Sequence, residues 1–173
     1  VTAVNDAPVA IADTATVLED SALTNINVIS NDTDVEEDTL TLITAIPDGS
    51  GTAAVNADGV SVDYTPAPDF NGTETITYTV SDGTDTSTGT LTITVTAVND
   101  APVAIADTAT VSEDSVLTNI DIVSNDTDVE GDTLILTAVT PDGSGTVTLN
   151  ADGVSVDYTP AANFNGTETI TYT

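Results

Sequence analysis

An internal repeat limits what this chain can fold into more than any other feature. The stretch "VTAVNDAPVAIADTAT" begins at Val1 and again at Val95, and the two copies stay in register without a gap as far as Thr173. The offset is 94 residues. Near-identical neighbours are typical of repeat proteins, in which each copy folds as the same supersecondary unit. We therefore expect like domains joined in an end-to-end array.

The repeat also predicts the domain boundaries. Residues 1–4 match the end of a copy and are interpreted as the tail of a preceding repeat. The first full repeat is then 5–98, and the second is 99–173. The second is expected to be truncated and to lack its last strand, because it has no counterpart of "VSDGTDTSTGTLTIT" at 80–94.

Within one copy the hydrophobic residues alternate with period two. In "TETITYTV", Ile76, Tyr78 and Val80 share one face, and threonines occupy the other, which predicts a strand with one buried and one solvated face. Turn sequences such as "PDGSG" and "NADG" separate such runs at short intervals. The expected strands lie near 13–17, 22–29, 39–45, 52–56, 60–65, 73–80 and 90–97. About seven short strands per repeat, with no helical period, indicate an all-β, immunoglobulin-like or cadherin-like β-sandwich.

The charge composition excludes several functions. The chain has 29 acidic residues and no Lys, Arg or His, which gives a formal net charge of −29. Binding to nucleic acid needs basic side chains that neutralise phosphates, and binding to an anionic membrane needs them too. There is no Cys for a disulfide, and no uninterrupted apolar stretch approaches a membrane span. We therefore expect neither nucleic-acid binding nor membrane insertion. A cation from outside the chain is expected to neutralise the acidic loops.

The acidic residues fall at the two ends of the predicted sandwich. If strands alternate in direction, the loop "NDTDVEED" of the first copy, like "NDTDVEGDTL" at 125–134 of the second, lies beside the entering linker "VNDAP", and "LEDS" and "PDFNG" lie at the opposite end. For the junction between the repeats, the candidate ligands are Glu19, Asp20, Asp69, Asn99, Asp100, Asp126, Asp128 and Asp132. The equivalent residues of the neighbouring junctions are Asn5, Asp6, Asp32, Asp34, Asp38, Glu113 and Asp114, together with Asn163 and Asn165.

This donor set predicts Ca²⁺. Carboxylate and amide oxygens without competing amines suit Ca²⁺, which takes six to eight oxygen ligands, better than Mg²⁺, which demands octahedral geometry. The loop is not an EF-hand, since Thr137 stands where that motif has a bidentate glutamate, and Glu37 replaces its turn glycine in the first copy.

The same residues carry a resemblance to two families. The linker "VNDAP", the "DTD" motif and a preceding glutamate resemble the calcium junction of cadherins. The set "NDAPVA", "EDS", "NDTDVEGDTL", "NADG", "YTP" and "NFNGTETITYT" more closely resembles the bacterial Ig-like, cadherin-like tandem repeats of large secreted adhesins and surface proteins. That resemblance implies an extracellular, cell-surface extender whose partners are neighbouring repeats and like chains in a fibre. The single Asn-Asp of the linker implies fewer ions than a cadherin junction holds.

Two function classes stay open at this point. The first is a structural stalk repeat that Ca²⁺ stiffens at its junctions. The second is an adhesive module that binds a glycan or a like repeat on another cell, and its specificity would reside where the copies differ, at 41–46 and 53–55. An enzyme is not expected, because His, Lys and Cys are absent and a small sandwich seldom provides a cleft.

Other acidic and aromatic residues receive plain structural interpretations. The acids outside the junctions are expected to be solvated: Asp13, Asp48, Asp63, Glu74, Asp82 and Asp85. Tyr64, Tyr78, Tyr158 and Phe70 are expected in the core.

Overall fold

The computed structural model describes residues 4–173, and within them it contains strands and no helix. The expected tail at 1–4 lies, apart from Val4, outside the described residues. The chain forms two compact units, Val1–Val98 (unit 1) and Asn99–Thr173 (unit 2). No helix in the described part of the chain could cross a membrane. The all-β sandwich expected from the sequence is confirmed in unit 1, and we describe each unit by itself.

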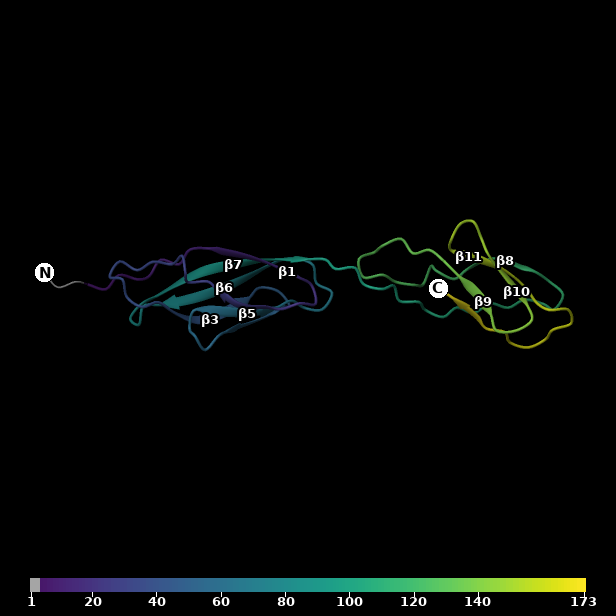
Figure 1. Ribbon diagram of the computed structural model, residues 1–173, viewed down its shortest axis with the longest axis horizontal. Helices are drawn as coiled ribbons and strands as arrows, with labels where there is room; N and C mark the ends of the chain where they lie inside the picture. Colours follow the sequence, from purple (N-terminus) through teal and green to yellow (C-terminus); the bar gives the residue numbers. More distant parts are fainter. Residues whose placement is uncertain (1–3) are drawn as a thin grey trace. The chain divides into compact units, whose positions relative to one another are not determined.

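The described part of unit 1, residues 4–98, contains seven strands, close to the predicted segments. They are β1 (Asp13–Leu18), β2 (Leu23–Asn27), β3 (Thr41–Pro47), β4 (Thr52–Val55), β5 (Ser61–Thr65), β6 (Gly72–Ser81) and β7 (Thr86–Thr96). One sheet has the order β1-β7-β6-β3 and the other the order β2-β5-β4 (Figure 1). Strand β1 pairs with β7 in parallel, whereas β6 pairs with β7 in an antiparallel ladder from Gly72↔Val95 to Ser81↔Thr86.

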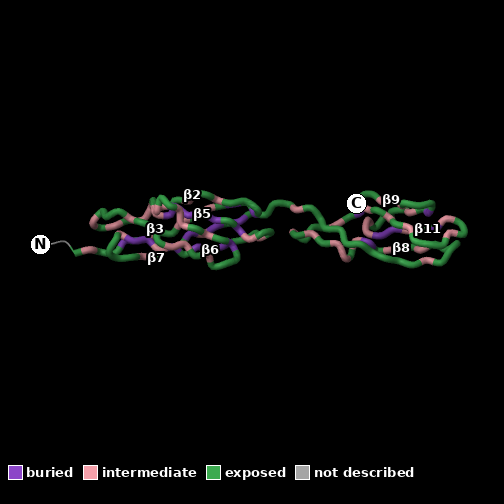
Figure 2. Tube along the Cα trace, turned by 90° about the horizontal axis from the view of Figure 1, so that it is seen from below, coloured by how far each residue is buried: buried purple, intermediate pink, exposed green. Residues whose placement is uncertain are grey.

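The two sheets of unit 1 enclose one hydrophobic core. Val62 and Tyr64 from β5 meet Ile76 and Tyr78 from β6 and Leu91 from β7, and all of these side chains are fully buried. Figure 2 shows the buried positions following β5, β6 and β7 through the middle of the unit. Tyr64, Tyr78 and Phe70 therefore lie in or against the core, as their strand positions predict.

The environment of Glu74 differs from the one expected from the sequence. It was expected to be solvated, but it is 2% exposed on the inner face of β6. Its Oε2 accepts a hydrogen bond from the Tyr64 hydroxyl at 2.7 Å, and its Oε1 accepts one from the Gly51 amide at 3.1 Å. Two donors make a buried carboxylate tolerable where no basic side chain exists. Burial and the neighbouring Glu74 raise the pKa of Tyr64 far above its usual range, so its hydroxyl remains a donor.

Unit 2 repeats part of this arrangement. Its strands are β8 (Leu117–Asp121), β9 (Val139–Pro141), β10 (Thr146–Leu149), β11 (Ser155–Thr159) and β12 (Ile170–Tyr172). The three-stranded sheet β10-β11-β8 matches β4-β5-β2, and the β12-β9 pair is a short version of β6-β3. Besides the last strand, unit 2 lacks a second strand of unit 1, and the sequence did not predict this difference. Residues 107–112, the counterpart of β1, form no strand in the structure, because β1 needs β7 as its ladder partner.

The two copies of the buried glutamate provide a stability test within one chain. We expect Glu74→Ala to lower the free energy of unfolding of unit 1 by about 2–4 kcal/mol, because it leaves the Tyr64 hydroxyl and Gly51 amide without acceptors and opens a cavity. The matched change is Glu168→Ala, which removes the same contacts to Tyr158 and Gly145 at a half-buried position. Water can replace those contacts, so a smaller loss is expected. Calorimetry of both variants makes the comparison, and equal losses would contradict it.

Candidate metal-binding loops

The loop at 31–38, and its counterpart at 125–132, is folded around its second aspartate. Asp34 Oδ1 accepts the backbone N–H groups of Glu36 at 3.0 Å and Asp38 at 3.1 Å. In unit 2, Asp128 Oδ1 accepts the N–H of Asp132 at 2.9 Å. Asp34 Oδ2 is buried without a hydrogen-bond partner. The turn thus fixes the carboxylate of the second aspartate of the "DTD" motif, and at Asp34 one of its oxygens makes no hydrogen bond.

A glutamate in each loop holds the entering linker. Glu36 Oε2 accepts the Asp6 N–H at 3.2 Å, and Glu130 Oε2 accepts the Asp100 N–H at the same distance. Glu130 Oε1 is buried without a hydrogen-bond partner. Glu36 and Glu130 were not among the candidate ligands expected from the sequence. Their place in the alternating run of acids "DTDVE" was the signal that could have included them.

The first aspartate of each loop has a different role from the second. Asp32 Oδ1 accepts the Ile11 N–H at 2.7 Å and the Tyr78 hydroxyl at 3.1 Å. Asp126 Oδ1 accepts the Ile105 N–H at 2.7 Å and the hydroxyl of Tyr172 at 3.1 Å. Both were expected as metal ligands. In the structure each fastens the start of its repeat to a core tyrosine, which commits at least one carboxylate oxygen to the fold.

Asn5 ties the linker to the hairpin at 82–85. Its Nδ2 donates to Asp82 Oδ2 at 3.0 Å and to Asp85 Oδ2 at 2.9 Å. The hydrogen bond from Asn5, followed by the amides of Thr84 and Asp85, lowers the pKa of Asp82 below its ordinary value of 3.8. These two acids were expected to be merely solvated. Asp85 is exposed, as expected, and Asp82 is half-buried, and both are in addition acceptors that position the linker.

The opposite end of unit 1 contains a buried carboxylate. Glu19 is 1% exposed, and its Oε1 accepts the Val98 N–H at 2.6 Å, while its Oε2 is buried without a hydrogen-bond partner. Asp20 and Asp69 are exposed, both have left-handed backbone conformations, and the Asp69 N–H points to Asp20 Oδ1 at 3.5 Å. This end therefore presents three carboxylates around the exit of β7.

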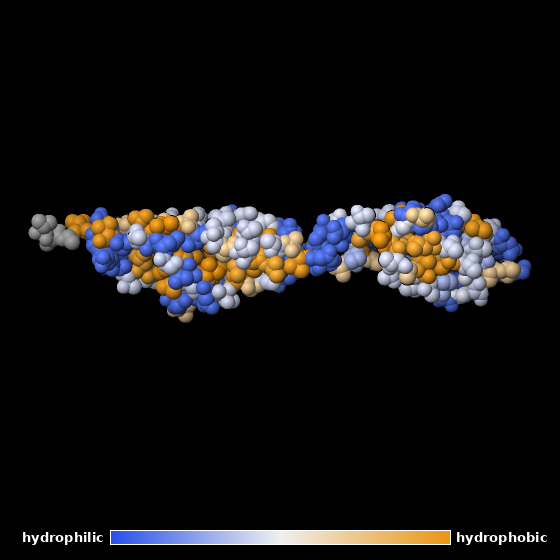
Figure 3. Space-filling view, turned by 45° about the horizontal axis from the view of Figure 1, so that its top comes forward, coloured by the Kyte–Doolittle hydropathy of each residue, from blue (hydrophilic) through white to orange (hydrophobic). Residues whose placement is uncertain are grey.

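The remaining candidates are more loosely held. Asn99 is exposed and its Nδ2 donates to the Asp100 carbonyl at 2.7 Å. Glu113 is exposed, unlike its counterpart Glu19, and Asp114 Oδ1 accepts the Asn163 N–H at 3.0 Å. Among residues 4–173, neither unit by itself brings three carboxylate oxygens within 4.8 Å of one another. Figure 3 shows hydrophilic residues gathered at the two ends of unit 2.

Three further acids that were expected to be solvated also anchor the fold. Asp48 Oδ1 accepts the Thr75 N–H at 2.8 Å, and Asp63 Oδ1 accepts from Asn56 and from the backbone of Asn25. The Asn56 hydrogen bond is the main cause that lowers the pKa of Asp63. The pKa of Asp13 shifts in the opposite direction. Burial is the largest cause that raises it, and repulsion from the Asp32 carboxylate raises it further.

Comparisons with known proteins agree with the fold. A family model described as a bacterial Ig domain matches residues 5–94 and 99–173. No curated protein matches the chain by sequence. The crystal structure of human protocadherin-24 EC1-2 is 18% identical at a TM-score of 0.52, covering 98% of this chain and 94% of that one. Its Form II is 17% identical at a TM-score of 0.53, covering 96% and 93%. At these identities the likeness concerns the fold alone.

A longer protein contains a similar segment. An endo-fucoidan hydrolase from glycoside hydrolase family 107 is 19% identical to the chain at a TM-score of 0.46. The match covers 96% of this chain but only 28% of the hydrolase. This chain therefore spans little more than a quarter of that enzyme's length.

The hydrogen bonds from the Asn5 side chain to Asp82 and Asp85, here called the Asn5 clip, predict a measurable change in the pKa of Asp82. We expect Asn5→Ala to raise the pKa of Asp82 toward 3.8, because it removes the hydrogen bond that lowers this pKa most. Since the folded-state pKa is below the unfolded one, the clip stabilises above pH 3.8 and that contribution is lost as the pH falls through the lowered value. An NMR titration of the Asp82 carboxyl carbon measures the shift. Asn99→Ala is the control, and an unchanged Asp82 titration in Asn5→Ala would contradict the assignment.

Proposed function

The chain belongs to the bacterial Ig domain family, and on that premise we propose that its repeats are structural extenders of a cell-surface protein, stiffened by Ca²⁺ where one repeat meets the next. Bacterial Ig-like and cadherin-like domains are commonly extracellular, which supports an extracellular location. Near-identical copies favour a spacer, because duplication lengthens a stalk without adding a new binding surface. We also propose that the repeats are not catalytic.

One observation supports the calcium proposal most directly. Glu19 is buried at the end of unit 1, one of its oxygens has no hydrogen-bond partner, and the chain contains no basic side chain that could neutralise it. A buried, unpaired carboxylate is strongly unfavourable unless a cation accompanies it. Glu130 and Asp34 each have a buried oxygen in the same condition. These oxygens suit a hard divalent cation.

The donor set fits Ca²⁺ in type as well as in charge. Glu19, Asp20 and Asp69 lie at the end of unit 1, where the chain leaves it. The chain continues directly from Val98 into the linker residue Asn99, and the 125–132 loop belongs to unit 2. We propose that Glu19, Asp20, Asp69, Asn99, Asp100, Asp128, Glu130 and Asp132 supply the ligands at such a junction. All offer carboxylate, amide or backbone oxygens, which is the set that Ca²⁺ uses. Asp126 is proposed to support the loop rather than to serve as the principal ligand.

The expected affinity suits a device that works outside the cell. Extracellular calcium modules bind at about 10⁻⁴ to 10⁻³ M, so they fill in calcium-rich surroundings and remain empty at cytosolic levels. A site that binds only the folded, joined arrangement stabilises it by about 1.4 kcal/mol at tenfold excess over Kd. The repeats would then be loosely joined during export and stiff afterwards.

The calcium response of two single-charge variants tests this proposal. Addition of Ca²⁺ is expected to raise the melting temperature of the wild-type chain, and Glu19→Gln should remove most of that rise, although glutamine can still accept the Val98 N–H. The control is Asp48→Asn, which removes one charge outside the proposed set of ligands and retains an oxygen facing the Thr75 N–H. Differential scanning calorimetry with Ca²⁺ and with chelator measures both. Equal calcium responses in the two variants would contradict the assignment of Glu19.

A scattering experiment tests the mechanical part of the proposal independently. Without Ca²⁺, acids at the junction repel one another, and salt screens exposed charges over about 8–10 Å. We expect the maximum dimension from small-angle scattering to depend on sodium chloride in chelator and to be larger and insensitive to salt in Ca²⁺. A dimension that is indifferent to both salt and Ca²⁺ would contradict a calcium-stiffened junction.

A further inference from the structure

Four asparagines of the chain begin the tripeptide Asn-x-Thr, and the structure presents them in two different ways. They are Asn31, Asn71, Asn125 and Asn165, and the middle residue is Asp or Gly. This tripeptide is an acceptor of N-linked glycans when its middle residue is not proline. An acceptor must also offer its side-chain nitrogen and its threonine to an enzyme. The exposure of these groups therefore decides which of the four asparagines can be modified.

Asn31 and Asn125 are closed to such an enzyme. Both are half-buried, and the side-chain oxygen of each is buried without a hydrogen-bond partner. Asn31 Nδ2 donates to the Ile11 carbonyl at 3.4 Å. Asn125 Nδ2 donates to Asp107 Oδ1 at 3.0 Å. In both copies the threonine of the tripeptide forms an antiparallel β-bridge with the start of its own repeat, so backbone and side chain are held together.

The tripeptide at 71–73 has the opposite character. Asn71, Gly72 and Thr73 are all exposed, and among residues 4–173 no group forms a hydrogen bond with the Asn71 side chain. Strand β6 begins at Gly72, and β3 pairs with it only from Ile76 onward. Gly72 and Thr73 therefore have a sheet neighbour on one side only, which is β7. This end of β6 is open to a second protein.

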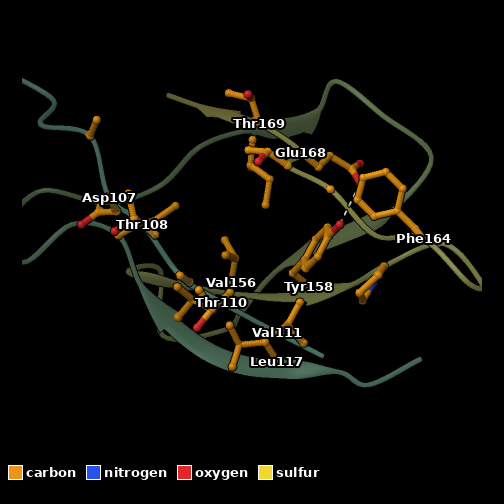
Figure 4. A pocket seen from close by; sticks show the side chains of 18 of the residues that line it. Asp107, Thr108, Thr110, Val111, Leu117, Val156, Tyr158, Phe164, Glu168 and Thr169 are labelled. Carbon is orange, nitrogen blue, oxygen red and sulfur yellow. Dashed lines mark hydrogen bonds between the residues drawn. The ribbon is translucent and has the colours of Figure 1, made fainter. Parts of the chain in front are cut away.

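Anchored residues on both sides hold the tripeptide outward. Phe70 packs against the core of unit 1, and Glu74 is buried on the inner face of β6. The corresponding segment of unit 2 is similar, since residues 165–167 are exposed. Figure 4 shows Glu168 pointing to Tyr158, whose hydroxyl donates to Glu168 Oε2 at 2.7 Å. Each repeat thus presents one free asparagine three residues before a fixed glutamate.

An acidic residue distinguishes Asn71 from its counterpart. Asp69 lies two positions before Asn71 and is exposed, whereas the equivalent position before Asn165 is Asn163. Both Asp69 and Asn163 have a left-handed backbone, so the two loops present this position in the same conformation. A transferase with a basic acceptor groove gains a charge-assisted contact with Asp69 that it does not gain with Asn163. Asn71 is therefore expected to be the better acceptor.

We propose that Asn71 is an acceptor site for an N-linked glycan, and that Asn165 is a weaker one. In the reaction, Asn71 Nδ2 attacks the anomeric carbon of a sugar carried on a lipid pyrophosphate. The N–C bond forms, the C–O bond to the pyrophosphate breaks, and one proton passes from Nδ2 to a base of the transferase. The lipid pyrophosphate leaves, and nothing is oxidised or reduced. A glycan here adds a bulky, solubilising group to the surface of the repeat.

This modification goes beyond the extender role and shares only the extracellular location with it. The test treats the folded 173-residue chain with a purified bacterial oligosaccharyltransferase and a lipid-pyrophosphate-linked oligosaccharide. Intact mass spectrometry is expected to show glycan addition, and peptide mapping should place it mainly at Asn71. Asn71→Gln should remove that modification. The readout is a mass and not a calcium response, so a failure of the extender proposal would leave this test unaffected.

Two reciprocal variants isolate the role of the charge. Asp69→Asn should lower the initial rate of modification at Asn71 severalfold, and Asn163→Asp should raise the rate at Asn165 by a similar factor. Each variant gives one repeat the residue that the other repeat already has at this position. The fold is therefore expected to tolerate both changes, and circular dichroism of each variant checks this.

Three results would overturn the proposal. The first is an unmodified Asn71 in the folded chain under conditions in which a synthetic peptide of residues 66–76 is modified. The second is modification of Asn31 or Asn125 as fast as that of Asn71, since the fold would then not select the acceptor. The third is an unchanged rate in both reciprocal variants, which would remove the preference for Asn71 over Asn165.

Discussion

No cationic side chain exists in this chain, so every carboxylate that the fold buries must be met by an N–H or O–H donor. Glu74 meets Tyr64 and the Gly51 amide, and Asp32 meets Tyr78 and the Ile11 amide. Charge-assisted hydrogen bonds of this kind are stronger than neutral ones and offset much of the desolvation of the acid. Where donors run out, as at Glu19 Oε2, the remaining charge needs a partner that the polypeptide does not supply. The lack of basic side chains thus explains why the buried acids are hydrogen-bonded, and it is also the reason to propose Ca²⁺.

The comparison of the two units shows how much of the architecture depends on one strand. With β7 present, β6 extends from Gly72 to Ser81 and β1 joins the sheet. Without a strand in that place, the corresponding ladder in unit 2 is reduced to Ile170–Tyr172. The other sheet is almost unaffected, since β10, β11 and β8 pair in the same order as β4, β5 and β2. Each sheet therefore forms from its own ladder contacts, and the core is closed only when both are complete.

Alternation and turn sequences predicted the strands well, because a period of two and Gly-rich turns are local signals. The predicted strand at 73–80 is β6 at Gly72–Ser81, and the predicted strand at 60–65 is β5 at Ser61–Thr65. The burial of Glu74 was not predicted, because an acidic side chain was assumed to be solvated. The alternation of the strand nevertheless places Glu74 on the same face as Ile76. The roles of Asp32 and Glu36 depend on contacts with residues about twenty to fifty positions away, and those contacts cannot be read from spacing alone.

The parallel pairing of β1 with β7 has a mechanical consequence. The chain enters the unit ahead of β1 and leaves it after β7, so tension between the ends pulls these strands in opposite directions along their common axis. Six residue pairs, from Asp13↔Leu91 to Leu18↔Thr96, then resist together in shear rather than opening one after another. The Glu19 N–H continues the ladder to the Thr96 carbonyl at 3.0 Å. The two strands through which force enters and leaves the domain are therefore clamped directly to each other, and the rest of the sandwich is shielded from the load.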